Sequence, residues 1–338
     1  MKISVFGSGA WGTAIALLLH DNGHSVTLWS KFEEETNVLR VKRENPFLSG
    51  VEIPAGIEIT SDLAEAVSGA SVVMIAVPSF AVRETAEALT GRLDDGCVVV
   101  SLSKGIEKDT SRLFTGILYE IFGENTPIAS VSGPTHAEEV ARRIPTACVS
   151  ASSDKKIAER VQGLLMNDRF RVYTSTDVIG VELGAALKNV IALSAGICDG
   201  LGMGDNTTAT LITRGLAEMA ELCVRMGGRK ETLAGLTGLG DLIVTCMSRH
   251  SRNRRAGVLI GKGMTAEEAM CEVGAVVEGY YAAKAARGLA EKMDVDMPIC
   301  LEAYRVLFEG KLPHDAMIDL MRRRRRSEHS TGEESWVT

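Results

Sequence analysis

The feature that most constrains this chain is a set of three closely spaced glycines near its start. Gly7, Gly9 and Gly12 form a G-x-G-x-x-G pattern directly after Lys2–Phe6, an apolar run typical of a short buried strand, and a helical stretch follows from about Trp11 to Asn22. The glycine pattern alone is weak evidence, but in this position it predicts a strand, a tight turn and a helix. Gly7 permits the turn, Gly9 lets the backbone approach a phosphate, and Gly12 lets the helix pack closely on the sheet.

Short runs rich in Val and Ile recur through the first half of the chain. They lie at Ser25–Trp29, Val72–Val77, Val98–Ser101, Ile128–Ser132 and Thr146–Ser150, and helix-compatible segments such as Ala81–Thr90 and Ser111–Phe122 lie between several of them. Strands that alternate with helices predict an α/β fold with an N-terminal doubly wound, Rossmann-like parallel sheet.

The character of the sequence changes near residue 178, where the strand-like runs stop and helical periodicity takes over. We therefore expect a dinucleotide-binding domain at 1–177, an all-helical C-terminal domain for substrate and catalysis at 178–322, and a flexible tail at 323–338. The run Arg322–Arg326 is either a solvated terminus or a nucleic-acid or membrane patch, and charge blocks at chain ends usually stay solvated.

Composition excludes several classes of protein. The 338 residues are 45% hydrophobic and 24% charged, which is a globular mixture, and the net charge of −7 argues against a nucleic-acid binder. A few local cations can still hold a small phosphorylated substrate. Seven scattered cysteines, an odd number without C-x-x-C spacing, indicate reduced core thiols rather than disulfides, and no metal site.

The chain also lacks the usual membrane and export signals. The apolar stretch Ala14–Leu19 has neither the positive start nor the cleavage site of a signal peptide, and no segment reaches the ~20 apolar residues of a membrane span. We expect a soluble, cytoplasmic protein without membrane insertion. The apolar content of the helical half is compatible with a homodimer.

The residues after the second predicted strand bear on the choice of nicotinamide cofactor. An acidic residue there would bind the ribose 2′-hydroxyl of NAD, but this chain has Ser30 and Lys31, which suit the 2′-phosphate of NADP. Glu33, Glu34 and Glu35 follow at once and weaken that inference. We expect NADP (NADPH) to be preferred, with NAD also possible.

Two motifs follow predicted strands, at the sheet edge where ligands bind in open α/β folds. Lys104 can hold a phosphate or polarise a carbonyl, or it is a solvated loop lysine. In the second motif, Gly133 and Pro134 force a turn, after which Thr135 has the spacing to cap a helix with Glu138. His136 is either an acid/base group or a packing residue.

The helix expected around residues 182–190 contains Lys188 and Asn189 among small and apolar residues. A buried ammonium is costly and its pKa falls, so Lys188 must pair with an acid or carry a proton. Asp241, after two glycines, could be its partner. Arg252 and Asn253 suit a phosphate, since Arg supplies a planar fork of donors.

Several longer motifs give the chain a family resemblance over residues 2 to about 321. They are GSGAWGTA (7–14), SLSKGIE (101–107), SGPTHAEEVA (132–141), ELGAALKNVIA (182–192), GDNTTATLITRGLAEM (204–219), GLGDLIVTCMSRHSRNRRAG (238–257) and VVEG (276–279). With these motifs the chain resembles the bacterial-type NAD(P)-dependent glycerol-3-phosphate dehydrogenases. The resemblance implies interconversion of sn-glycerol 3-phosphate and dihydroxyacetone phosphate, which would supply glycerol 3-phosphate for phospholipid synthesis.

The resemblance also implies roles for single residues. Lys188 matches the proton acceptor, with Asn189, Lys104 and Asp241 beside it in the catalytic group. Matches to substrate-binding positions are Lys104, Gly133, Thr135, Lys188, Asp241, Ser251, Arg252 and Asn253. Matches to cofactor-binding positions, with the glycine turn, are Gly7, Gly9, Ala10, Trp11, Gly12, Lys31, Lys104, Ala137, Arg252, Val276 and Glu278. Ala10 departs from the family's frequent Ser, so one phosphate contact there would come from backbone alone.

Two other functions stay open on the sequence. A dehydrogenase for a 3-hydroxy acid or a sugar acid would share the glycine turn and the helical half, but it would not need the phosphate-binding residues Ser251, Arg252 and Asn253. A non-catalytic nucleotide sensor would bind the cofactor without turnover, and the buried Lys188 argues against it.

Overall fold

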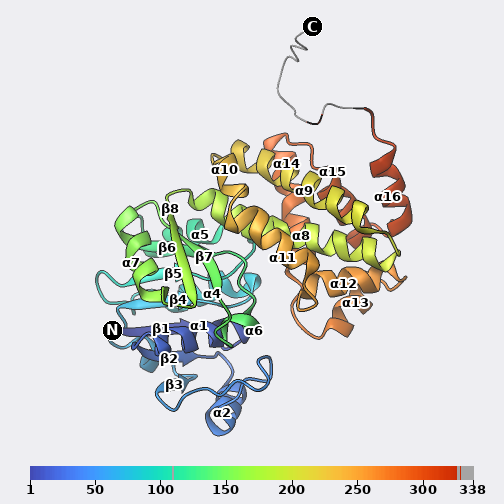
Figure 1. Ribbon diagram of the computed structural model, residues 1–338. Coiled ribbons are helices and arrows are strands. Elements are labelled where there is room, and N and C mark those ends of the chain that lie inside the picture. Colours follow the sequence, from blue (N-terminus) through green and yellow to red (C-terminus); the bar gives the residue numbers. More distant parts are fainter. Residues whose placement is uncertain (109, 326–327, 329–338) are drawn as a thin grey trace.

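The computed structural model divides into a half that contains a sheet and a helical half (Figure 1). It describes residues 1–108, 110–325 and 328. Most of the predicted tail, including Arg326 at the end of the arginine run, lies outside the described residues. The last strand ends at Ser175 and the first long helix of the second half begins at Val178. The predicted fold class is confirmed; the domain bounds stay a prediction.

The described residues form one eight-stranded sheet in the order β3-β2-β1-β4-β5-β6-β7-β8. The strands are β1 (Lys2–Phe6), β2 (Ser25–Trp29), β3 (Ile57–Thr60), β4 (Val72–Ile75), β5 (Val98–Ser101), β6 (Ile128–Ser132), β7 (Thr146–Ala151) and β8 (Phe170–Ser175). The strands β3 and β8 were not predicted, since Glu58, Arg171 and Tyr173 interrupt their apolar runs.

The sheet is parallel from β3 through β6, as expected, but the predicted strand at Thr146–Ser150, which is β7, does not continue the parallel arrangement. β7 pairs antiparallel with β6, with Ser132 opposite Val149, and β8 runs parallel to β7. The connection after β6 contains only the short helix α6 (Ala137–Val140). A parallel return needs a crossover long enough to span the sheet, so the chain turns back along β6 instead.

Both faces of the sheet are buried under helices. On one face, Ile3, Val5 and Met74 pack with α1 (Ala10–Asp21) and α7 (Lys155–Leu165). The alternate side chains of the strands face a second core that includes α3 (Leu63–Val67), α4 (Val82–Ala88) and α5 (Phe114–Phe122). A short 3-10 helix, η1 (Ser79–Ala81), precedes α4, and α2 (Glu33–Lys42) lies beyond β2.

The described residues of the second half form helices and no strand. They are α8 (Val178–Gly200), α9 (Asp205–Arg225), α10 (Lys230–Leu233), the π-helical turn η2 (Leu236–Gly240), α11 (Asp241–Met247), α12 (Arg252–Gly261), α13 (Ala266–Val273), α14 (Glu278–Met293), α15 (Pro298–Phe308) and α16 (Pro313–Met321). α8 is the central helix (Figure 1). It is long and apolar enough to cross a membrane, but 89% of its apolar window is buried inside the protein. Its composition is explained by that central position.

Glycines let α12 lie directly against α8. A Cβ added at Gly257 would sit 2.0 Å from the Leu193 carbonyl oxygen, and one at Gly196 would sit 2.1 Å from the Arg254 carbonyl oxygen. Gly200 and Gly261 make equally close approaches. The start of α12 is thereby placed beside the middle of α8, where two of the predicted site residues lie.

We expect Gly257→Ala to destabilise the protein by about 1–3 kcal/mol, because the added methyl group overlaps backbone that cannot move without shifting α8. Gly163→Ala on α7 is the matched control, since its Cβ would meet nothing within 4 Å. That change should be neutral or stabilising by up to about 1 kcal/mol. Urea unfolding measures both, and equal effects would contradict the close-packing argument.

A buried carboxylate joins α8 to the sheet half. Glu182 Oε2 accepts from the Thr115 hydroxyl at 2.6 Å, and the Thr115 backbone N–H, in the first turn of α5, donates to the same carboxylate at 3.2 Å. Burial raises the pKa of Glu182 to about 7, although its hydrogen bonds with Thr115 oppose the shift. The charged form is therefore the less favourable one in the folded protein.

Because this pKa is higher when the protein is folded than when it is unfolded, the stabilising contribution of Glu182 is full below pH 4.5 and is lost as pH rises through about 7. Glu182→Gln should remove that dependence. We expect the free energy of unfolding of the wild-type protein, relative to this variant, to fall between pH 5 and 8. Urea unfolding of both proteins at several pH values across that range measures this difference. If the prediction is wrong, the two free energies of unfolding will change with pH in the same way.

Candidate active site

Two lysines share one buried carboxylate at the junction of the two halves. Lys188 Nζ, from α8, donates to Asp241 Oδ1 at 2.7 Å, and Lys104 Nζ donates to Asp241 Oδ2 at 2.8 Å. Lys104 also donates to the Gly133 carbonyl oxygen at 2.8 Å and to Thr135 Oγ1 at 3.3 Å. Five of the predicted site residues therefore meet at one place.

Local structure explains how each group reaches this junction. Lys104 and Gly133 follow the neighbouring strands β5 and β6, whose carboxyl ends lie at the same edge of the sheet. Gly133 has φ +153°, and a Cβ there would lie 2.8 Å from the Cys148 Cα, so this turn requires glycine. On the helical side, η2 delivers Asp241 to the first position of α11.

Thr245 completes the environment of Lys188. It lies four residues after Asp241 on α11, so both side chains project from one helix face. Thr245 Oγ1 accepts from Lys188 Nζ at 2.8 Å and is 2.6 Å from the Asp241 carbonyl oxygen, to which it donates. Sequence reasoning did not select Thr245; its i+4 spacing from Asp241 was the available signal.

The electrostatics of the junction favour an amine that can gain and lose a proton. Burial lowers the pKa of Lys188 to about 8, and the nearby Lys104 lowers it further, while Asp241 opposes both effects. Burial alone would raise the pKa of Asp241, but the two ammonium groups outweigh it and the pKa of this carboxyl lies below its usual range. Asp241 thus stays ionised while Lys188 titrates close to physiological pH.

The predicted cap of the helix after Gly133 is wrong. His136, not Thr135, is the residue before α6, and no side chain caps that helix. The Thr135 hydroxyl is instead engaged by Lys104 and the Gly133 carbonyl. Burial first, and then Lys188 and Lys104, lower the pKa of His136, so its imidazole is neutral beside the lysines.

A second network links the helices that flank Lys188. Asn253 Nδ2 on α12 donates to Asn189 Oδ1 at 2.9 Å, and Asn253 Oδ1 accepts from the Gly279 N–H at 2.8 Å. Gly279 follows Glu278 at the start of α14. Ser251, just before α12, caps that helix by accepting from the Arg254 N–H. The network therefore connects α8, α12 and α14 next to the lysine pair.

Glu278 reaches back to the sheet half. Its Oε1 accepts from the Ser79 N–H at 3.1 Å, while its Oε2 is buried without a hydrogen-bond partner among the residues described. Burial raises the pKa of Glu278, whereas hydrogen bonding with Ser79 and, to a smaller extent, the charge of the exposed Arg252 oppose that effect. Val276 is half-buried just before it. An orphaned buried carboxylate oxygen between the halves is a group that a ligand could satisfy.

The glycine turn has the predicted form. Gly7 has φ +118°, and a Cβ on Gly12 would lie 1.8 Å from the Gly7 carbonyl oxygen, whereas one on Gly9 would meet nothing within 4 Å. Space is therefore open in front of Gly9 at the start of α1, where a phosphate could approach. Ala10 begins α1, and Trp11 Nε1 donates to the Leu102 carbonyl on the way to Lys104.

Two further predicted cofactor residues, Ala137 and Lys31, lie outside the glycine turn. Ala137 is buried at the start of α6. Lys31 is exposed and forms an ion pair with Glu84 on α4. In this structure the Lys31 ammonium therefore pairs with Glu84 rather than with a group of the glycine turn.

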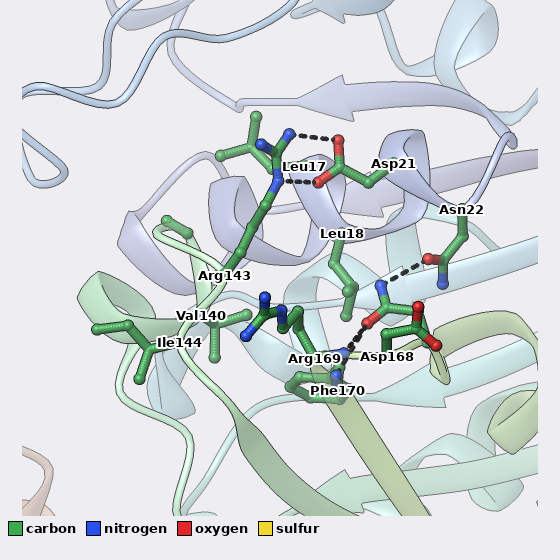
Figure 2. A pocket seen from close by; sticks show the side chains of 12 residues that line it. Leu17, Leu18, Asp21, Asn22, Val140, Arg143, Ile144, Asp168, Arg169 and Phe170 are labelled. Carbon is green, nitrogen blue, oxygen red and sulfur yellow. Dashed lines mark hydrogen bonds and ion pairs between the residues drawn. The ribbon is translucent and has the colours of Figure 1, made fainter.

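A cavity of about 400 Å³ lies elsewhere, against the end of α1 and the loops around β7 and β8 (Figure 2). Its rim includes Arg143, which forms a two-bond ion pair with Asp21, and Asn22, which accepts from Asn167. None of the predicted site residues lines it. We assign it no part in the chemistry.

Comparison with known proteins gives one consistent result. The family profile described as NAD-dependent glycerol-3-phosphate dehydrogenase N-terminus matches residues 2–158, and the corresponding C-terminus profile matches residues 177–318. A glycerol-3-phosphate dehydrogenase of Fusobacterium nucleatum, named for NAD(P)+, is 50% identical over 97% of this chain and 98% of its own length. The Agathobacter rectalis protein of the same name is 51% identical over 98% of both chains.

Solved structures agree with the sequence relatives. The crystal structure of glycerol-3-phosphate dehydrogenase from Coxiella burnetii has a TM-score of 0.92 and 37% identity, and the match covers 95% of this chain and 99% of that one. A D-mandelate dehydrogenase solved with NADH has a TM-score of 0.61 but 15% identity, over 95% and 99% of the two chains. That likeness shows a shared fold alone.

We expect Asp241→Asn to lower the free energy of unfolding by about 3–5 kcal/mol, because it leaves Lys188 and Lys104 without a buried counter-charge. Asp199→Asn is the control. Asp199 pairs with Arg254, both side chains are 27% exposed, and its loss should cost at most about 1 kcal/mol. Chemical denaturation at pH 7 compares the two variants. Similar losses would mean that Asp241 is not the electrostatic centre of the site.

Proposed function

Because this chain belongs to the NAD(P)-dependent glycerol-3-phosphate dehydrogenases, we propose that Lys188 is the group that transfers the proton when it interconverts sn-glycerol 3-phosphate and dihydroxyacetone phosphate. The observation that carries this assignment is the position of the Lys188 amine, buried and held between Asp241 and Thr245. The carboxylate orients the amine, and burial tunes its pKa to the range in which it can act in both directions.

The residues present fit a dinucleotide. The open space at Gly9 provides room for a pyrophosphate, and the N–H groups at the start of α1 can donate to it. The Glu278 Oε2 atom, which lacks a partner among the described residues, offers an acceptor near the lysine pair. Ala10, Trp11, Ala137 and Val276 would line the same region. When bound, the nicotinamide accepts or supplies the hydride at C2 of the substrate.

The chain's own residues then manage the proton and the charge. During oxidation, neutral Lys188 Nζ takes the proton of the C2 hydroxyl as the hydride leaves C2. During reduction, the Lys188 ammonium returns that proton to the developing alkoxide. Lys104 adds positive charge at the same oxygen, and the ionised Asp241 keeps both amines in place. Asn189 stays aligned through its bond with Asn253.

Substrate selection requires a binding site for the phosphate group. We assign that role to the start of α12, where Ser251, Arg252 and Asn253 meet the positive end of the helix dipole. Arg252 is exposed and free to turn towards a ligand, while Asn253 is already fixed by Asn189 and Gly279. The backbone at Gly133 and the Thr135 hydroxyl would face the triose from the sheet side.

The preference for NADP(H), the cytoplasmic location and the homodimer remain proposals. For NADP(H), Ser30 and Lys31 at the end of β2 would hold the 2′-phosphate. Lys31 would first have to leave Glu84, and an exposed pair of this kind is weak enough to exchange.

A dehydrogenase for a non-phosphorylated hydroxy acid is the competing function, and only its fold is supported by likeness to the D-mandelate enzyme. The purified protein should oxidise NADH or NADPH only when dihydroxyacetone phosphate is added. Turnover with dihydroxyacetone or a non-phosphorylated oxo acid, at the same efficiency as with dihydroxyacetone phosphate, would reject the proposal.

Lys188→Met should reduce kcat by about 10²–10⁴-fold, because the proton then has no carrier. Lys155→Met, which changes a lysine with a 75% exposed side chain, should leave kcat unaltered. Near-normal turnover by the Lys188 variant would contradict the assignment.

The pH dependence provides an independent check. Oxidation of glycerol 3-phosphate needs neutral Lys188, so its kcat should rise with pH through a value near 8, whereas reduction should fall over the same range. A profile without a limb between pH 7 and 9 in either direction would argue against Lys188. Steady-state rates in both directions, with saturating cofactor, supply the measurement.

A further inference from the structure

A carboxylate from α2 lies between the glycine turn and the end of β2. Glu35 Oε2 accepts from the Ser30 hydroxyl at 2.9 Å and from the Ser8 hydroxyl at 3.2 Å. Ser8 is the residue between the first two glycines of the turn, and Ser30 follows the last residue of β2. One acidic oxygen therefore bridges the two segments that flank the adenosine end of a dinucleotide site.

Both segments are held firmly, so the position of this carboxylate is well defined. Asn45 is buried and its Nδ2 donates to the Ser8 carbonyl at 2.8 Å and to Thr13 Oγ1 at 2.7 Å. The Ser30 N–H donates to the Thr60 carbonyl of β3 at 3.1 Å. Ser8 and Ser30 are themselves buried, whereas Glu35 is exposed on its other side.

This placement matters for the ribose that carries the 2′ group. In dinucleotide-binding folds an acidic side chain near the end of β2 accepts a hydrogen bond from the free 2′-hydroxyl of NAD, and a cation there accommodates the 2′-phosphate of NADP. The residue at the end of β2 is Ser30, but Glu35 brings a carboxylate to it from the first turn of the next helix. The lysine that follows Ser30 in the chain, Lys31, pairs with Glu84 instead.

We propose that Glu35 is the residue that discriminates between the two nicotinamide cofactors, because its carboxylate binds the 2′-hydroxyl of NAD(H) and repels the 2′-phosphate of NADP(H). The inference rests on the NAD(P)-dependent activity proposed above. It opposes the preference for NADP(H) that Ser30 and Lys31 suggest. A 2′-phosphate can occupy this place only if Glu35 releases both serines, and Lys31 must turn from Glu84 to neutralise it.

Binding of adenosine nucleotides tests the proposal without substrate or turnover. Isothermal titration of the full chain with adenosine 2′,5′-bisphosphate and with adenosine 5′-monophosphate yields a ratio of two dissociation constants. Glu35→Gln keeps the shape of the side chain but removes its charge. We expect this variant to favour the 2′,5′-bisphosphate by about tenfold more than the wild type does, since a like charge is removed from the 2′ position.

Glu34→Gln is the matched control, because it removes the same charge one residue away, whereas the Ser8 and Ser30 hydroxyls donate to Glu35. The ratio of kcat/KM for NADPH over NADH should move in the same direction as the nucleotide ratio in Glu35→Gln. A shift no larger than that of Glu34→Gln, or one towards the 5′-monophosphate, overturns the proposal.

Failure of the proposed activity would be distinguishable. It would appear as no oxidation of either cofactor with dihydroxyacetone phosphate in the wild-type protein, whereas the nucleotide titrations report on Glu35 alone.

Discussion

The site depends on one buried carboxylate that two ammonium groups share, of which Lys188 is buried and Lys104 is partly exposed. Asp241 is 1% exposed and bonds Lys188 through one oxygen and Lys104 through the other. Lys188 could not stay buried and charged without it, since an unpaired buried charge is among the costliest features a fold can contain. Because Lys104 comes from the sheet half and Lys188 from α8, the same carboxylate that tunes the chemistry also joins the two halves.

Close backbone contact makes that electrostatic arrangement possible. Gly196, Gly200, Gly257 and Gly261 let α12 approach α8 until carbonyl oxygens would touch any added Cβ. The start of α12 then lies beside Asn189, and the Asn253 side chain can form hydrogen bonds with both Asn189 and Gly279. The residues assigned to the phosphate and to the proton thus share one rigid core, in which small displacements are resisted by packing on every side.

Much of this arrangement could be predicted from local sequence. The glycine pattern after an apolar strand indicated a βα turn with the observed geometry. The apolar surroundings of Lys188 indicated that it is buried and either pairs with an acid or carries a proton, and Asp241 was a candidate partner. The reversal of β7 could not be predicted in the same way, because it depends on how far α6 can carry the chain over the sheet. The cap expected at Thr135 failed for a similar reason, since its hydroxyl is taken by Lys104, which is 31 residues away.

Sequence by itself determined the fold class, the family and the chemical types of the groups at the site, because periodicity, glycine spacing and residue identity are local properties of the chain. Tertiary structure alone decided which groups meet. Through it, Lys188 donates to Thr245, and Glu278 accepts from the Ser79 N–H. It also placed Glu35 where Ser30 and Ser8 donate to it, and Lys31 where it pairs with Glu84. Contacts of this kind join residues distant in the chain, and their energies depend on burial and distance, which no linear pattern records.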